Sequence, residues 1–176
     1  MKLRQLVRLK PLDSSELILT VAGWLAQKEN YQWLQFGDGR QILTPVLLKI
    51  MSQRDAHVLR VYVSEDGAPL GIVGLDEVNR NFKTARLWVV AGEKNCCGRG
   101  YATQAVSKML TLAFEELGLH AVTTWIVEHN PSVRVAENVR FNFIGRLRQC
   151  HWIDGRAYDR LWFDLLASEH KENDDA

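Results

Sequence analysis

Two closely spaced glycines, Gly98 and Gly100, constrain this chain more than any other feature because they separate a β-rich run from a long amphipathic stretch. Residues 84–90 are rich in β-branched and aromatic side chains, which is typical of a strand. Apolar side chains recur at helical spacing over residues 101–117, and Gly118 predicts the helix end. Such glycines let the backbone approach a ligand, while the N–H groups of the first helical turn point at an anion. The pattern therefore predicts a phosphate-binding loop, although the glycines could also merely open a helix.

The composition indicates one globular unit. A chain of 176 residues with 47% hydrophobic content can bury a sizeable core. Its 22 basic and 21 acidic side chains give a formal net charge of +1, which argues against nucleic acid or a membrane surface as a partner. We expect a single domain over residues 1–167. Residues 168–176 are polar and charged, and we expect a disordered tail there.

The chain has no apolar run of the roughly 20 residues that a bilayer span needs, and its first residues lack an apolar signal core. The sequence therefore predicts a cytoplasmic location. Three cysteines do not make a disulfide framework, and no Cys or His cluster suits zinc, so we expect reduced thiols and no metal. Cys96 and Cys97 are adjacent, but neighbouring cysteines rarely close a comfortable disulfide.

Strands and helices alternate along the rest of the chain. Strand patterns occupy residues 3–9, 58–63, 69–75, 84–90, 121–127, 143–151 and 157–166. Asp13 and Glu16 predict a capping box for a first helix, and Thr44 with Pro45 predicts the start of a second. Asn130 and Pro131 predict a short helix that runs to about residue 138. The result is an α/β chain with an antiparallel meander in its middle.

This element order and the glycine loop resemble the GCN5-related N-acetyltransferase (GNAT) family. The acetyl-CoA motif of that family is Gln/Arg-x-x-Gly-x-Gly/Ala, and Gly98 and Gly100 stand at its two glycine positions. Asn95 stands where Gln or Arg is usual, so Lys94 or Arg99 is expected to supply the positive charge to the pyrophosphate. The resemblance implies a GNAT fold with a mixed, mostly antiparallel central sheet of about seven strands flanked by about four helices.

Residues 130–141 are similar to a segment of the ribosomal-protein-alanine acetyltransferase (RimJ/RimL-like) subgroup of this family. Ser132 follows Asn130 closely, as in that segment, although the spacing is only loosely kept. Arg140 replaces the glycine normally found before Phe141, and this replacement puts the tight turn at that point in question. The subgroup resemblance implies that the Ser132 hydroxyl protonates the leaving thiolate and that Asn130 binds the amide arm of the cofactor.

The resemblance also implies how acetyl-CoA is bound. Free N–H groups of the strand before the loop would hold the thioester carbonyl and the pantetheine amides, and the helix start would hold the pyrophosphate. The expected cofactor-binding residues are Trp88, Val89, Val90, Cys97, Gly98, Arg99, Gly100, Tyr101, Ala102 and Asn130.

Acid–base chemistry needs a further group, because the acceptor amine must lose a proton before it attacks. Glu128 is the candidate base, while Asp76 or a chain of waters is an open alternative. Both acids could instead be solvated strand ends. Asn130 and Ser132 could likewise serve only to cap the short helix.

Trp33, Phe36 and Trp125 are candidates for the wall of the acceptor cleft, with Asp76 as a fourth substrate-binding residue. The aromatic side chains could equally form a small structural cluster. The predicted function is direct transfer of acetyl to a primary amine, either a protein N-terminus or a small molecule. A polyamine, aminoglycoside or amino sugar remains an open acceptor, and a non-catalytic acyl-CoA sensor is the alternative. We expect a monomer or a homodimer.

Overall fold

The computed structural model describes residues 6–35 and 43–172, and these build one seven-stranded sheet. Its strand order is β1-β2-β3-β4-β5-β7-β6, and every neighbouring pair is antiparallel except β4 and β5. The strands are β1 (Arg8–Pro11), β2 (Val58–Val63), β3 (Pro69–Asn79), β4 (Thr84–Ala91), β5 (Ala121–Val127), β6 (Asn142–Ile153) and β7 (Arg156–Leu166). The predicted mixed, mostly antiparallel sheet is therefore confirmed.

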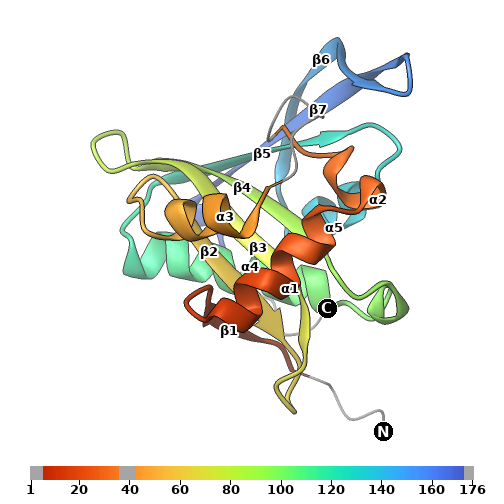
Figure 1. The fold of residues 1–176 in the computed structure, drawn as a ribbon. Coiled ribbons are helices and arrows are strands. Elements are labelled where there is room, and N and C mark those ends of the chain that lie inside the picture. The colour runs from red at the N-terminus through yellow and green to blue at the C-terminus, as the bar shows by residue number, and fades with distance from the viewer. Residues whose placement is uncertain (1–5, 36–42, 173–176) are drawn as a thin grey trace, which may run out of the picture.

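Helices cover both faces of the sheet (Figure 1). They are α1 (Ser15–Leu25), α2 (Lys28–Tyr31), α3 (Pro45–Ser52), α4 (Tyr101–Thr111) and α5 (Ser132–Asn138). α1 and α3 pack on one face, whereas α4 and α5 pack on the other. A π-helical turn, Leu112–Glu116, extends α4. Of these helices, only the four-residue α2 has no counterpart in the sequence prediction, because it is too short to show a helical period.

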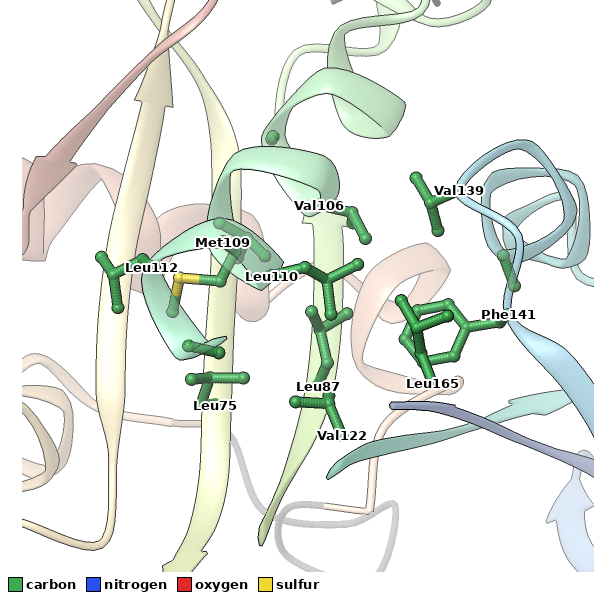
Figure 2. Close-up of a cluster of buried hydrophobic side chains, with 14 of the residues drawn as sticks. Leu75, Leu87, Val106, Met109, Leu110, Leu112, Val122, Val139, Phe141 and Leu165 are labelled. Carbon is green, nitrogen blue, oxygen red and sulfur yellow. The ribbon is translucent and has the colours of Figure 1, made fainter. Parts of the chain in front are cut away.

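The larger of two hydrophobic cores lies between α4 and the sheet (Figure 2). Leu110 points from α4 towards Leu87 of β4, and Met109 lies above Leu75 of β3. Each fully buried side chain of this kind contributes roughly 1.5–3 kcal/mol. The second core lies under α1 and α3, and together the two cores fix the sheet between its helical layers.

Local signals set the helix starts. The Ser14 side chain accepts the backbone N–H of Leu17 (3.2 Å), so α1 starts after Ser14 and the predicted capping box at Asp13 is wrong. The Thr44 hydroxyl accepts the N–H of Leu47 (3.2 Å), and this confirms the predicted cap of α3.

The turn between α5 and β6 keeps its tight geometry without a glycine. Arg140 has a φ of +66°, which lies in the left-handed region that favours glycine. Phe141 then donates its N–H to the Ala136 carbonyl (3.0 Å), and its buried ring joins the larger core. The replacement of glycine by Arg140 is therefore tolerated at a cost in backbone strain.

The beginning of the predicted disordered tail is ordered in the structure, so that part of the prediction is wrong. Residues Ala167–Glu169 form a 3-10 turn. His170 follows with Nε2 at 2.8 Å from the Thr111 hydroxyl, and Glu172 lies 3.1 Å from the Lys108 ammonium. The segment is held by these polar contacts and by the His170 ring, whose centroid lies 5.5 Å from that of Phe114, and composition alone does not indicate such contacts. Residues 173–176 lie outside the described part.

Candidate active site

β4 and β5 diverge in the middle of the sheet. Their parallel ladder covers only residues 84–86 of β4 and 121–123 of β5. Where the ladder ends, the Thr124 hydroxyl donates a hydrogen bond to the Leu87 carbonyl (2.8 Å). Beyond that bond the edge of β4 has no ladder partner on the β5 side, so its backbone groups are available to a ligand.

A cleft of about 510 Å³ opens at this divergence. Both faces of the sheet contribute to it, together with the segment after α2 and the start of α5. Its lining residues are Trp33, Leu34, Leu87, Val89, Val106, Thr124, Trp125, Ile126, Val127, Asn130, Ser132, Val135, Ala136 and Phe141. The structure thus brings five predicted site residues together at one cleft: Trp33, Val89, Trp125, Asn130 and Ser132.

The glycine loop leads from the end of β4 into α4. A 3-10 turn, Lys94–Cys96, precedes it, and Gly98 and Gly100 adopt φ values of +78° and +80°. A Cβ atom on Gly98 would meet nothing within 4 Å, so backbone conformation rather than space calls for glycine there. No side-chain hydrogen bond caps α4 within the described chain. Its first N–H groups therefore suit an anionic ligand.

Asn130 and Ser132 stand at the start of α5, facing the cleft. The Asn130 Oδ1 atom accepts the backbone N–H of Ser132 (2.8 Å), which is a capping contact. The helix itself begins at Ser132, one residue later than predicted. The Ser132 hydroxyl makes no hydrogen bond to any described residue, so it remains available to a ligand in the cleft.

A comparison with known families fits this geometry, since a domain profile described as "Acetyltransferase (GNAT) domain" matches residues 7–142. The chain belongs to the GNAT family. The family predicted from the glycine loop and the element order is therefore confirmed.

Two bacterial relatives align with part of this GNAT chain. The uncharacterized N-acetyltransferase p20 of Bacillus licheniformis is 27% identical over 116 residues, 65% of this chain and 65% of that protein. A provisional ribosomal N-acetyltransferase, YdaF of Bacillus subtilis, is 32% identical over 108 residues, 59% of this chain and 57% of that protein. The chain thus matches less than two thirds of the length of either relative.

Solved structures share the fold over nearly the whole chain. The spermidine N-acetyltransferase of Vibrio cholerae, in complex with CoA and spermine, has a TM-score of 0.81 at 20% identity. That likeness covers 93% of this chain and 96% of the other. The predicted GNAT fold is therefore confirmed.

Two cations near the glycine loop differ in what they contact. The Lys94 ammonium donates to the Ala91 carbonyl (3.0 Å) and to the side-chain oxygen of Asn30. Arg99 is exposed and makes no hydrogen bond or ion pair with the described part of the chain. Of the two cations predicted for the pyrophosphate, Arg99 is the one that makes no hydrogen bond within the described chain.

The loop is tied to the opposite layer of the molecule through Trp24, a contact that the sequence did not predict. The indole N–H of Trp24 donates to Glu93 (3.1 Å), and the Trp24 carbonyl accepts from the Asn30 amide (2.8 Å). A Cβ atom on Gly92 would stand 2.1 Å from the Trp24 ring. These contacts fix the path of the chain just before the glycines.

Glu128, the predicted base, holds strands together. One carboxylate oxygen accepts the N–H of Asp159 (2.9 Å), and the other lies 3.2 Å from the Arg146 guanidinium. Glu128 is not among the residues that line the cleft. Its role as base stays a prediction, while its contacts fasten the end of β5 to β6 and β7.

Asp76, predicted as a substrate-binding residue or an alternative base, lies apart from the cleft lining. Its buried carboxylate lies 2.8 Å from Nδ1 of His57 and 3.9 Å from the Arg86 guanidinium. Burial raises the pKa of Asp76, while hydrogen bonds from His57 and the Trp88 indole oppose that rise. Asp76 is thus enclosed by its own partners. Phe36, the remaining predicted acceptor residue, lies outside the described residues.

Three polar residues next to Trp125 were not predicted from the sequence. His151 lies with Nε2 at 2.6 Å from the Gln32 carbonyl, so this nitrogen donates and Nδ1 accepts from the Arg160 guanidinium (3.0 Å). Burial lowers the pKa of His151, and the charge of Arg160 acts in the same direction. The Arg160 guanidinium lies over the Trp125 ring, 3.9 Å from its centroid. No sequence signal joins these residues, because they come from separate elements.

Across residues 6–35 and 43–172, no helix has the length and apolarity to cross a membrane. In the same ranges no three His, Cys, Asp or Glu side chains gather into a group that can hold a metal. Cys96, Cys97 and Cys150 are free thiols.

Proposed function

We propose that this GNAT chain is an acetyl-CoA-dependent N-acetyltransferase that moves the acetyl group directly from the thioester to a primary amine. The observation that carries the proposal is the cleft between the diverging strands. It is flanked by an uncapped helix start on the cofactor side and by the unengaged Ser132 hydroxyl.

The cofactor would bind mainly to the backbone. The N–H group of Val89 suits the thioester carbonyl or a pantetheine amide, because backbone groups alternate along a strand and the Leu87 carbonyl, two residues earlier, faces the open edge of β4. The N–H groups of Trp88 and Val90, which were predicted for the same role, face β3. The helix start from Cys97 to Ala102 suits the pyrophosphate, where each anion contact is worth about 0.3–2 kcal/mol. Arg99 adds a charge that no described residue neutralises.

The residues at the start of α5 would carry the proton chemistry. As the neutral amine attacks the carbonyl and the C–S bond breaks, the Ser132 hydroxyl donates its proton to the leaving sulfur and takes up the proton that the nitrogen loses. Asn130 fixes the backbone of Ser132 through its oxygen, which leaves its amide N–H groups to hold the pantetheine arm. An α-amino acceptor of pKa near 8 needs less help from a base than an alkylamine near 10.

Trp33 and Trp125 would form the wall along which the acceptor enters. The acceptor is proposed to be a protein N-terminus, as the name of YdaF suggests, or a small-molecule amine, as the spermidine enzymes suggest. Amino sugars and aminoglycosides remain candidates. A cytoplasmic location and a monomeric or homodimeric state stay predictions.

Release of CoA from acetyl-CoA tests the proposal, with a panel of peptides, polyamines, aminoglycosides and amino sugars as acceptors. Because Cys97 is exposed, release should be followed by chromatography rather than by a thiol reagent. Calorimetry with CoA measures donor binding separately. Binding without turnover on any amine would favour the sensor, and the absence of both would overturn the proposal.

A further inference from the structure

Arg160 lies beside the cleft, in contact with a residue that lines it, although it is not itself among the lining residues. It comes from β7 and its half-buried side chain stacks on Trp125, which lines the cleft. Two of its nitrogens, Nε and Nη2, lie 3.3 and 3.0 Å from Nδ1 of His151, and His151 is itself fixed by the Gln32 carbonyl. The guanidinium is therefore held in one orientation by the Trp125 ring on its face and the His151 ring at its edge.

The charge of Arg160 is not balanced within the described chain. Its partners are the neutral acceptor nitrogen of His151 and the Trp125 ring, and no described carboxylate lies within ion-pair distance. Arg86, the nearby arginine whose charge also acts on Arg160, is paired with Glu77 (3.0 Å) and lies 3.9 Å from Asp76. One cation at this edge of the cleft is thus neutralised, and the other is not.

The described lining of the cleft holds no acidic side chain to attract a cation. Every described lining residue is uncharged. A cationic acceptor could use the face of a tryptophan instead, but Arg160 already lies over the Trp125 ring at 3.9 Å. A polyamine that enters beside Trp125 would meet the positive charge of this guanidinium, which repels its ammonium groups.

We propose that Arg160 binds an anionic group of the acceptor, a carboxylate, and so selects amines that carry a carboxylate near the reacting nitrogen. This inference rests on the proposed acetyltransferase function and names the acceptor class for it. A guanidinium matches a carboxylate by paired N–H donors, and the stacked orientation leaves less freedom to lose on binding.

Paired acceptors that differ in one charge test the proposal. Ala-Glu and Ala-Gln dipeptide amides form one pair, and γ-aminobutyrate and its amide form a second, with spermidine as the cationic probe. In the wild type, kcat/KM should favour the acid of each pair by about tenfold to a hundredfold, mostly through KM. Arg160→Gln should bring each ratio close to one, while Arg160→Lys should keep a preference of the same sign because the charge remains.

Arg156→Gln is the matched control, because Arg156 lies on the same strand over an aromatic ring, Tyr158 at 5.5 Å, yet beside the exposed hairpin turn. It should leave the ratios unchanged. Equal rates on acid and amide in the wild type, or efficient turnover of spermidine, would overturn the acceptor class while leaving the acetyltransferase intact. Loss of the preference in Arg160→Lys would also overturn it. Absence of both CoA binding and CoA release would instead refute the proposed function, and this inference with it.

Discussion

The two sides of the cleft are built in different ways. On the cofactor side, the edge of β4 and the loop of Gly98 and Gly100 present backbone N–H groups. On the acceptor side, Trp125 and Arg160 present side chains, which His151 holds in place. A backbone site depends on chain conformation and tolerates side-chain change, whereas a side-chain site changes its ligand with each substitution. We expect the first side to keep the donor constant and the second to set the acceptor.

The largest effect is expected from breaking the backbone site. Gly100→Asp places a side chain at a φ of +80° and a carboxylate at the start of α4. Strain of about 1–3 kcal/mol should lower the stability of the fold. Repulsion of the phosphates by the new carboxylate should weaken CoA binding by about 10²- to 10³-fold, measured by calorimetry.

Gly118→Asp is the control for that experiment. Gly118 also has a positive φ, +64°, but stands beyond the other end of the α4 segment. It should lose similar stability and keep CoA affinity. If both variants bound CoA as the wild type does, the glycine loop would not be the pyrophosphate site.

Ser132→Ala tests the one side chain on which the proposed chemistry depends. Loss of the proton donor should lower kcat by about 10²-fold, since general acid catalysis typically contributes 10²- to 10⁴-fold and water can substitute in part. CoA affinity should change little, because the Ser132 N–H rather than its hydroxyl bonds to Asn130. An unchanged kcat with the best acceptor would mean that the Ser132 hydroxyl is not the proton donor and that Ser132 serves only at the start of the helix.

The same contrast explains what the sequence could predict. Gly98 and Gly100 leave a signal in the sequence because a backbone site calls for a residue type at a fixed spacing. Trp33 and Trp125 were predicted as aromatic candidates for the wall of the acceptor cleft. Arg160 has no such signal, because its proposed role depends on its contact with Trp125, thirty-five residues earlier in the chain. The pairing of β5 with β7 brings the two residues together.

Asp76 and Glu128 were nominated as functional acids because each follows or ends a predicted strand. Their partners, such as His57 for Asp76 and Arg146 for Glu128, become visible only when the register of the sheet is known. The position of these acids in the sequence therefore predicted that they lie at the ends of strands. It did not predict which residues they contact. Strand β2, by contrast, was predicted with its bounds, because its apolar pattern is local.

The point where the two sides separate can be tested through Thr124. Thr124→Val keeps the shape of the side chain but leaves the Leu87 carbonyl without its 2.8 Å donor in a buried place. The free energy of unfolding in urea should fall by about 1–3 kcal/mol. Thr20→Val, which removes an exposed hydroxyl bonded to the Glu16 carbonyl, should cost clearly less. Equal losses would mean that the Thr124 bond does not hold the strands at their divergence.

Arg140→Gly tests whether the glycine that the family normally has before Phe141 is needed only for its backbone conformation. A non-glycine residue at a φ of +66° costs the folded state about 1–2 kcal/mol, which the glycine variant avoids. Glycine also gives the unfolded chain more conformational freedom, and this opposes the gain in stability by about 0.4–1 kcal/mol. A net stabilisation of up to about 1 kcal/mol is expected in urea unfolding. Arg134→Gly, inside α5, should instead destabilise by about 1 kcal/mol. A destabilised Arg140→Gly variant would show that the arginine side chain itself contributes to the fold.

The smallest effect concerns two histidines, one on each side of the molecule. Burial lowers the pKa of His151 beside the acceptor wall and of His170 against α4. A base whose folded pKa lies below its ordinary value of 6.5 stabilises the fold fully above that pH. The contribution is then lost as the pH falls from 6.5 through the lowered value, because protonation favours the unfolded chain. Tm should therefore fall over this interval. If the contacts around His151 beside the acceptor wall are the tighter ones, His151→Asn should reduce this fall of Tm more than His170→Asn does. If both variants reduced the fall of Tm equally, protonation of His151 beside Trp125 would cost the fold no more than protonation of His170 beside α4.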